Sequence, residues 1–155
     1  MSKVLFVCLG NICRSPLAEG LANHLISCYD DVAVEFDSCG TAAYHIGEQP
    51  DNRTVANAKQ NGVILNHQAR QFERHDFEEF DYILVMDESN KENVLRLDVA
   101  GQYADKVQLM RNYDPEGHGK VVPDPYYGGE QGFQNVFEIL HRSVDNFIKT
   151  ELVGK

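Results

Sequence analysis

The sequence predicts an α/β fold built on a parallel β-sheet flanked by helices, and two observations support this prediction. Short apolar runs alternate along the chain with longer segments of helical periodicity, which is the order expected of strand–helix–strand units. The runs at 3–9 and 82–86 are apolar almost throughout, as is typical of central parallel strands that helices cover on both faces. The 155 residues contain no repeat, low-complexity tract or linker, so we expect one domain over residues 1–155.

Four strands are predicted from short runs whose apolar residues are continuous or alternate. They are expected at residues 3–9, 32–37, 82–86 and 106–110. In the second of them, Val32, Val34 and Phe36 alternate with other residues, so one face of that strand is expected to be buried. Four strands joined by helical segments fit a single parallel sheet.

Helices are predicted where apolar residues recur every three or four positions. They are expected at residues 16–28, 51–61, 88–97 and 133–148. Gly62 is expected to end the second helix, because glycine readily adopts the left-handed conformation found after helix C-termini. The last helix has the clearest apolar face. Residues 111–129 are rich in Pro, Gly, Tyr and Asp and are expected to form mostly loop.

Composition and charge disfavour several classes of protein. The chain carries 14 basic and 24 acidic residues, and a formal charge of −10 argues against nucleic acid or an acidic membrane as partner. We expect no signal peptide, and the first apolar run is too short to span a bilayer. The four cysteines suggest neither a disulfide framework nor, with histidine, a zinc site. We therefore expect a cytoplasmic protein without metal or cofactor.

The most informative motif, C-L-G-N-I-C-R-S at residues 8–15, lies between the first strand and the first helix. Successive backbone amides in such a turn, together with a helix N-terminus, suit a tetrahedral oxyanion. Arg14 offers a planar fork of donors that can bind two phosphate oxygens. Ligands of open parallel sheets sit beyond the carboxyl ends of the strands, where this motif is expected. Cys8 is then a candidate nucleophile, and the alternative is a buried core cysteine.

Asp124 is the candidate proton donor for such chemistry. A thiolate can take a phosphoryl group without a metal, but the leaving oxygen then needs a proton. Pro123 and Pro125 fix the backbone on both sides of Asp124 and would hold its carboxyl group in a stiff loop. Tyr126 and Tyr127 follow directly and would line a cleft for an aromatic leaving group. Taken alone, Asp124 fits a simple turn residue equally well, and the adjacent tyrosines favour the proton donor.

Three segments together resemble the low-molecular-weight protein tyrosine phosphatases. They are C-L-G-N-I-C-R-S-P at 8–16, F-D-Y-I-L-V-M-D-E-S-N at 80–90 and D-P-Y-Y at 124–127. The resemblance covers nearly the whole chain and keeps the order and spacing of the motifs. It implies a four-stranded parallel sheet of flavodoxin-like winding (phosphotyrosine protein phosphatase I-like), with the phosphate-binding loop after the first strand. It also implies phosphotyrosine-containing proteins as partners, with a tyrosine kinase as one candidate, and a monomer or weak dimer.

The resemblance assigns roles residue by residue. Cys8 matches the nucleophile, Arg14 the phosphate-binding arginine and Asp124 the general acid. The residues that complete the phosphate-binding loop are Leu9, Gly10, Asn11, Ile12, Cys13 and Ser15. The polar residues that match a network supporting this loop are Asn11, Ser15, Ser38 and His67, and Asp87 matches an acid that partners the histidine. The aromatic residues that match the pocket wall are Tyr44, beside His45, and the pair Tyr126 and Tyr127.

The expected mechanism passes through a phosphocysteine. The loop amides and Arg14 favour an anionic sulfur on Cys8, which attacks phosphorus in line while Asp124 protonates the phenolic oxygen. Water activated by Asp124 then releases phosphate. Cys13 lies on the same tight loop, so a Cys8–Cys13 disulfide would form a reversible redox switch. A packed Cys13 without a redox role is the alternative, and Cys28 and Cys39 are expected in the core.

Three other functions fit parts of this pattern. An arsenate reductase would share the fold and the Cys-x5-Arg loop, but it needs two further cysteines, typically near residues 80–90, and none occurs there. A module that only binds phosphotyrosine would be expected to lack the nucleophile or the acid. A flavodoxin-type electron carrier would have a hydroxyl-rich first loop and would not need Cys8 or Arg14.

Overall fold

The computed structural model describes residues 1–154, apart from the side chain of Tyr127. The strands are β1 (Ser2–Cys8), β2 (Val34–Gly40), β3 (Tyr82–Val85) and β4 (Val107–Leu109). The α-helices are α1 (Arg14–Ile26), α2 (Asn52–Gln60), α3 (Asp76–Glu79), α4 (Glu88–Leu95) and α5 (Gly129–Phe147). Shorter helical turns are η1 (Ala104–Lys106), η2 (Met110–Tyr113), η3 (Pro125–Tyr127) and η4 (Ile148–Leu152).

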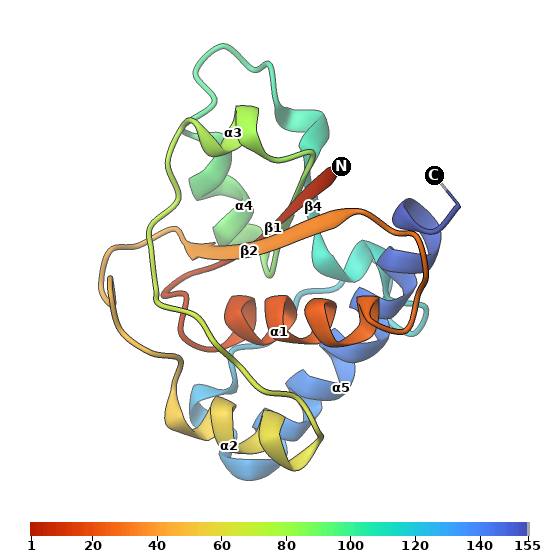
Figure 1. Cartoon of the computed structure of the whole chain (residues 1–155). Helices are drawn as coiled ribbons and strands as arrows, with labels where there is room; N and C mark the ends of the chain where they lie inside the picture. The colour runs from red at the N-terminus through yellow and green to blue at the C-terminus, as the bar shows by residue number, and fades with distance from the viewer. Residues whose placement is uncertain (155) are drawn as a thin grey trace.

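The four strands form one parallel sheet in the order β2-β1-β3-β4, so the predicted fold class is confirmed (Figure 1). β1 pairs on one side with β2, where Val4 lies opposite Phe36, and on the other with β3, where Val4 lies opposite Tyr82. The chain first moves outward from β1 to β2 and then returns to the other side of β1. Such a reversal of winding opens a crevice at the carboxyl end of the central strand, and that crevice is where open α/β sheets bind ligands.

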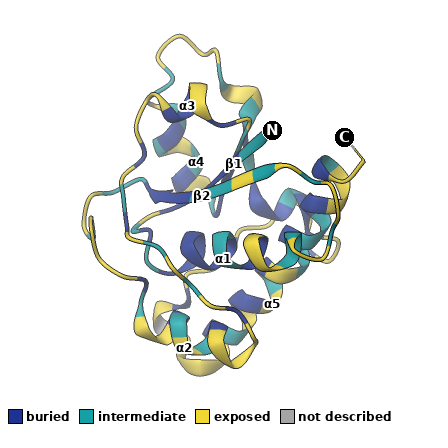
Figure 2. Cartoon of the chain, viewed as in Figure 1, coloured by how far each residue is buried: buried dark blue, intermediate teal, exposed yellow. Residues whose placement is uncertain are grey.

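Helices cover both faces of the sheet and create two apolar cores (Figure 2). Val4 and Phe6 of β1 face the core formed with α1 and α5, whereas Leu5 and Val7 face the core that includes Val94 of α4. All four of these β1 side chains have an exposed fraction of 0%. The continuous apolar run in the sequence therefore reflects a strand that is buried on both faces.

The elements agree with the sequence except at their ends and in short turns. β2 extends to Gly40 rather than ending at 37, because it stays paired with β1 as far as Cys8. α5 begins at Gly129, and its predicted apolar face is buried. Gly62 has a φ of 85° and follows Asn61, the C-cap of α2, as a glycine that ends a helix does. The short helix α3 was not predicted, since four residues are too few to show periodicity.

The two cysteines that were expected in the core differ in the structure. Cys39 lies in β2 with an exposed fraction of 0%, as expected. Cys28 is exposed, so its predicted burial is wrong. The reason is that α1 ends at Ile26 and the chain turns away from the core before residue 28.

Within residues 1–154, none of the helices combines the length and the apolar character that a membrane span requires.

Candidate active site

The turn at residues 8–14 folds back around the sulfur of Cys8. β1 ends at Cys8 and α1 begins at Arg14. The backbone N–H of Asn11 donates a hydrogen bond to Cys8 Sγ at 3.3 Å. Asn11 has a φ of 58°, in the left-handed region that costs a residue with a side chain about 1–2 kcal/mol. The loop therefore needs contacts from outside itself to hold this conformation.

The side-chain amide of Asn11 supplies those contacts, and it lies 1% exposed. Its Nδ2 donates to Ser15 Oγ at 2.8 Å and to Ser38 Oγ at 3.0 Å. Its Oδ1 lies 2.7 Å from His67 Nε2 and accepts from the backbone N–H of Arg70 at 3.0 Å. The full hydrogen-bonding capacity of the amide is used, so the structure brings together the four polar residues predicted to support the loop.

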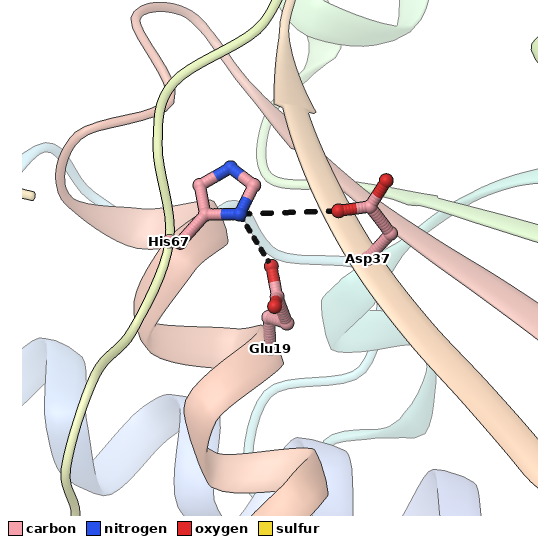
Figure 3. A group of neighbouring side chains, drawn as sticks. All are labelled: Glu19, Asp37 and His67. Carbon is pink, nitrogen blue, oxygen red and sulfur yellow. Dashed lines mark ion pairs between the residues drawn. The ribbon is translucent and has the colours of Figure 1, made fainter. Parts of the chain in front are cut away.

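His67 connects this amide to two carboxylates (Figure 3). Its Nδ1 lies 3.1 Å from Glu19 Oε1 and 3.9 Å from Asp37 Oδ1. Glu19 was not identified from the sequence, although it follows Ser15 by four residues and so shares its helix face. His67 reaches this position because the chain around it runs beside β2, where Gly40 donates to the carbonyl of Arg70 at 2.8 Å.

Glu19, Asp37 and His67 place ligand-type atoms within 4.8 Å of one another, a spacing that would suit a cation. Each of them already has a protein partner. Ser38 donates to Glu19 Oε1 at 2.7 Å, and Arg70 pairs with Asp37 at 3.0 Å. We interpret the cluster as hydrogen-bonded support for Asn11 rather than as a metal site.

Gly40 allows the loop to pack directly against the end of β2. A Cβ atom at this position would lie 2.6 Å from the carbonyl oxygen of Leu9 and 3.1 Å from the nitrogen of Asn11. Because both contacts are to backbone, neither could be relieved by a side-chain rotation. Gly40 was not identified as a site residue, although a glycine at the end of a strand often marks such a close approach.

Arg14 is 4% exposed and is held by two acceptors. Its Nη1 donates to Asp87 Oδ2 at 2.8 Å and to the carbonyl oxygen of Val122 at 2.9 Å. Asp87 also accepts from the backbone N–H of Asn90 at 2.8 Å and so caps α4. The expectation that Asp87 partners the histidine is therefore wrong. Asp87 follows β3, whereas His67 lies beside β2 on the opposite side of β1.

Cys8, Arg14 and Asp124 line one small cavity of about 120 Å³ at the carboxyl end of β1. Cys8 is 3% exposed, and its sulfur lies 3.0 Å from Ser15 Oγ. Asp124 is exposed and its Oδ1 accepts from the backbone N–H of Tyr126 at 3.0 Å, which orients the carboxyl group. Three residues that are far apart in the sequence thus converge on one space. Its other lining residues are Leu9, Gly10, Ile12, Cys13, His45 and Tyr126.

The aromatic wall of this cavity differs from the expectation. Tyr126 lines it and is 51% exposed. Tyr44 is 75% exposed and does not line it, whereas the neighbouring His45 does. The His45 ring lies close to the loop because position 10 is a glycine, where an added Cβ would be only 3.0 Å from the ring. The side chain of Tyr127 lies outside the described residues.

Cys13 also lines the cavity and is 8% exposed. Burial raises the pKa of this thiol to about 11, and the negative charge of Asp51 adds to the effect. Cys13 is therefore a protonated thiol at neutral pH. Cys8 and Cys13 are both reduced, and the predicted disulfide between them stays a prediction.

Comparison with known proteins connects this geometry to one family. Residues 3–155 match the family described as "Low molecular weight phosphotyrosine protein phosphatase". A relative of that name in Schizosaccharomyces pombe is 44% identical over 154 residues, which cover 96% of each chain. A solved protein tyrosine phosphatase from Entamoeba histolytica, with Hepes in its active site, superposes with a TM-score of 0.89 at 39% identity and covers 96% of each chain. A Drosophila arginine phosphatase superposes with a TM-score of 0.88 at 33% identity, covering 95% of this chain and 96% of its own.

Proposed function

Since this chain belongs to the low molecular weight phosphotyrosine protein phosphatase family and is a protein-tyrosine phosphatase, we propose that it transfers phosphate from tyrosine first to Cys8 and then to water. The observation that carries this mechanism is the convergence of Cys8, Arg14 and Asp124 on one small cavity. The three side chains supply what phosphate transfer without a metal requires, namely a nucleophile, an anion-binding group and a proton donor.

Cys8 attacks phosphorus as an anionic sulfur. The backbone N–H of Asn11 donates to Sγ at 3.3 Å, and an anionic sulfur accepts such a bond better than a thiol does. Asn11 Nδ2 donates to Ser15 Oγ, so the single hydroxyl proton of Ser15 is directed elsewhere, toward Cys8 Sγ at 3.0 Å or the carbonyl of Cys39 at 3.2 Å. When the Ser15 hydroxyl points toward Cys8 Sγ, it stabilises the sulfur as the phosphocysteine breaks down.

Arg14 and the loop amides stabilise the charge on the transferring phosphoryl group. Among the described residues, the partners of the Arg14 guanidinium engage only Nη1, so Nε and Nη2 remain for two phosphate oxygens. Asp87 and Val122 fix the plane of the guanidinium before substrate binds. Such preorganised donors act where negative charge is spread over the equatorial oxygens of a loose transition state.

Asp124 protonates the departing phenolic oxygen and afterwards takes a proton from the attacking water. Its loop is stiffened by Pro123 and Pro125, and Tyr126 orients the carboxyl group through its backbone N–H. Asp124 is exposed at the rim of the cavity, where a leaving group that points outward would meet it.

The substrates are phosphoproteins, and the finer assignments form part of the proposal. We place the activity in one domain over residues 1–155 of a cytoplasmic monomer or weak dimer, with a tyrosine kinase as one candidate partner. The similarity to an arginine phosphatase makes phosphoarginine the second candidate substrate. Phosphotyrosine is favoured, because the relative named for it is the more similar in sequence, at 44% against 33% identity.

The mechanism is tested by hydrolysis of p-nitrophenyl phosphate and phenyl phosphate at about pH 5.5 in the presence of a metal chelator. Cys8→Ser should abolish turnover of both substrates. Asp124→Ala should lower kcat/KM, which reports the step that expels the leaving group, by about 10²-fold or more for phenyl phosphate and by less for p-nitrophenyl phosphate, since the more basic leaving oxygen depends more on a proton donor. Asp105→Ala, at an exposed aspartate in η1, is the matched control.

An active Cys8→Ser enzyme, or equal losses for the two substrates in Asp124→Ala, would contradict the assigned roles. Peptides that carry phosphotyrosine or phosphoarginine at the same position then separate the two candidate substrates. We expect the phosphotyrosine peptide to have the higher kcat/KM.

A further inference from the structure

A second cavity, of about 790 Å³, lies beside the catalytic one. It is formed by residues 47–52 together with Ile12, His45 and Tyr126. Ile12, His45 and Tyr126 also line the catalytic cavity, so the two cavities lie side by side. A phosphotyrosine in the catalytic cavity would therefore place the neighbouring part of its peptide in or beside this second space.

The chain from Thr41 to Asp51, which includes most residues that line the second cavity, is hydrogen-bonded to the phosphate-binding loop at both ends. At one end the backbone N–H of Thr41 donates to the carbonyl of Cys8 at 2.9 Å, and at the other the N–H of Asp51 donates to the carbonyl of Ile12 at 2.8 Å. Between them, Glu48 accepts from the N–H of Ala69 at 2.9 Å through its carbonyl. The cavity is thus built on backbone hydrogen bonds and keeps a fixed position relative to Cys8.

The charged groups of this cavity are acidic. Glu48 and Asp51 line it, and the described residues that line it include neither lysine nor arginine. Asp51 is paired with Arg53 at 3.2 Å, whereas Glu48 contacts His45 at 2.7 Å, which balances its charge only if the imidazole is protonated. The Glu48 side chain is 57% exposed and can turn toward an incoming group. A cationic side chain would find a complementary surface here, and an acidic one would meet like charge.

We propose that this second cavity is a subsite for a residue that flanks phosphotyrosine and that it selects a basic side chain, lysine or arginine. The proposal rests on the proposed function and adds the substrate class that this enzyme prefers. The enzyme would then recognise two groups of opposite charge on its substrate: Arg14 binds the phosphate, and Glu48 attracts the flanking cation. An exposed ion pair changes a rate constant by up to about fivefold, so the preference is expected to be of that size.

The test uses two pairs of phosphotyrosine peptides, and the members of each pair differ only in one flanking residue, lysine or glutamate. This residue precedes phosphotyrosine in one pair and follows it in the other. The measured quantity is the ratio of kcat/KM for the lysine and glutamate peptides. Because both peptides are measured with the same enzyme, this ratio is insensitive to a general change in activity. In wild type it should reach about two- to fivefold for at least one position and should fall as salt is added.

Glu48→Gln should bring that ratio close to one, while its amide oxygen can still accept a hydrogen bond from His45. Glu48→Lys should invert the preference. Glu78→Gln is the matched control, because it removes the same charge from an exposed position in α3, and the adjacent Glu79 contacts Lys3 at the opposite end of β1 from Cys8. This control should keep the wild-type ratio.

A lysine-to-glutamate ratio of kcat/KM near one at both positions in wild type would contradict the proposed subsite. So would a ratio that Glu48→Gln leaves unchanged. If wild type cleaves none of the peptides, the proposed function itself fails. The two failures are therefore distinguishable in one set of measurements.

Discussion

Asn11 shows how one side chain determines the shape of the catalytic loop. It combines a left-handed backbone with an amide that makes hydrogen bonds to Ser15, Ser38, His67 and the backbone of Arg70. Among uncharged side chains of that size, only the asparagine amide offers two N–H donors and a carbonyl oxygen with two lone pairs in one plane. The cost of the unusual φ is therefore offset by contacts that only asparagine makes at this position.

We predict that Asn11→Ala lowers both stability and activity. The variant leaves buried polar partners unpaired, each of which costs about 1–3 kcal/mol, and the loop loses its preorganised amides. The free energy of unfolding in urea should fall by about 2 kcal/mol or more, and kcat for p-nitrophenyl phosphate should fall with it. Asn23→Ala, at an exposed position in α1, is the control and should change neither quantity appreciably. Full activity in Asn11→Ala would show that the network is not needed for catalysis.

Cys13 is the second residue whose role can be tested directly. If Cys8 is oxidised to a sulfenic acid by peroxide, the thiol of Cys13 can condense with it, forming a disulfide and releasing water. Wild type should then recover activity when dithiothreitol is added after peroxide. Cys13→Ala should recover much less, because the sulfenic acid continues to irreversible forms. Cys28→Ala removes an exposed cysteine and should behave as wild type. Equal recovery in Cys13→Ala would exclude the switch.

At the scale of elements, the start of α2 contacts both the Asp124 loop and α5. Arg53 Nη1 donates to the carbonyl oxygen of Tyr126 at 3.3 Å. Its guanidinium lies 4.8 Å from the ring centre of Tyr126 and 4.9 Å from that of Phe133 in α5, and Asp51 holds its Nε at 3.2 Å. One side chain of α2 thus joins the turn that follows Asp124 to the first turns of α5.

We predict that Arg53 positions the Asp124 loop without contacting the reacting atoms. Arg53→Met should lower kcat/KM for phenyl phosphate by about threefold, since each cation–π contact is worth about 0.5–1 kcal/mol at an exposed site. The loss should be smaller for p-nitrophenyl phosphate, which depends less on the acid. Arg53→Lys should be intermediate, because it keeps the charge but loses the planar fork. Lys59→Met, in the last turn of α2, provides a control. Equal losses for the two substrates would contradict a role through Asp124.

At the scale of the whole molecule, the order of the strands decides where the site lies. β1 is central, and the loop that follows it is bordered by residues at the carboxyl ends of both neighbouring strands. Ser38 and Gly40 come from β2 on one side, and Asp87 follows β3 on the other. Because the loop links both halves of the sheet, a ligand bound in it should stabilise the entire fold.

We predict that inorganic phosphate raises the thermal stability of the protein. A ligand at one hundred times its Kd adds about 2.7 kcal/mol to the free energy of unfolding, which corresponds to a rise of roughly 5–10 °C in Tm for a chain of this size. Chloride at the same ionic strength should have little effect. Arg14→Met should lose most of the shift, measured against its own Tm without phosphate. An unchanged shift in Arg14→Met would mean that phosphate binds elsewhere.

The sequence by itself determined the strands, the long helices and the phosphate-binding loop. These features depend on residues that are close together in the chain, since periodicity reports a buried face and the turn from Cys8 to Arg14 is local. The tyrosines next to Asp124 favour an acid over a simple turn residue, and the resemblance to a phosphatase family assigns Asp124 as the general acid. That assignment agrees with the cavity that Asp124 shares with Cys8 and Arg14.

Only the tertiary structure decided which distant side chains meet. Asp87 pairs with Arg14 rather than with His67, because β1 separates β2 from β3. Glu19 completes the support of Asn11 through His67, and His45 rather than Tyr44 lines the cavity. Each of these contacts depends on the order of strands in the sheet and on the path of the loops. Local periodicity carries no information about either, since it describes only which face of an element is buried.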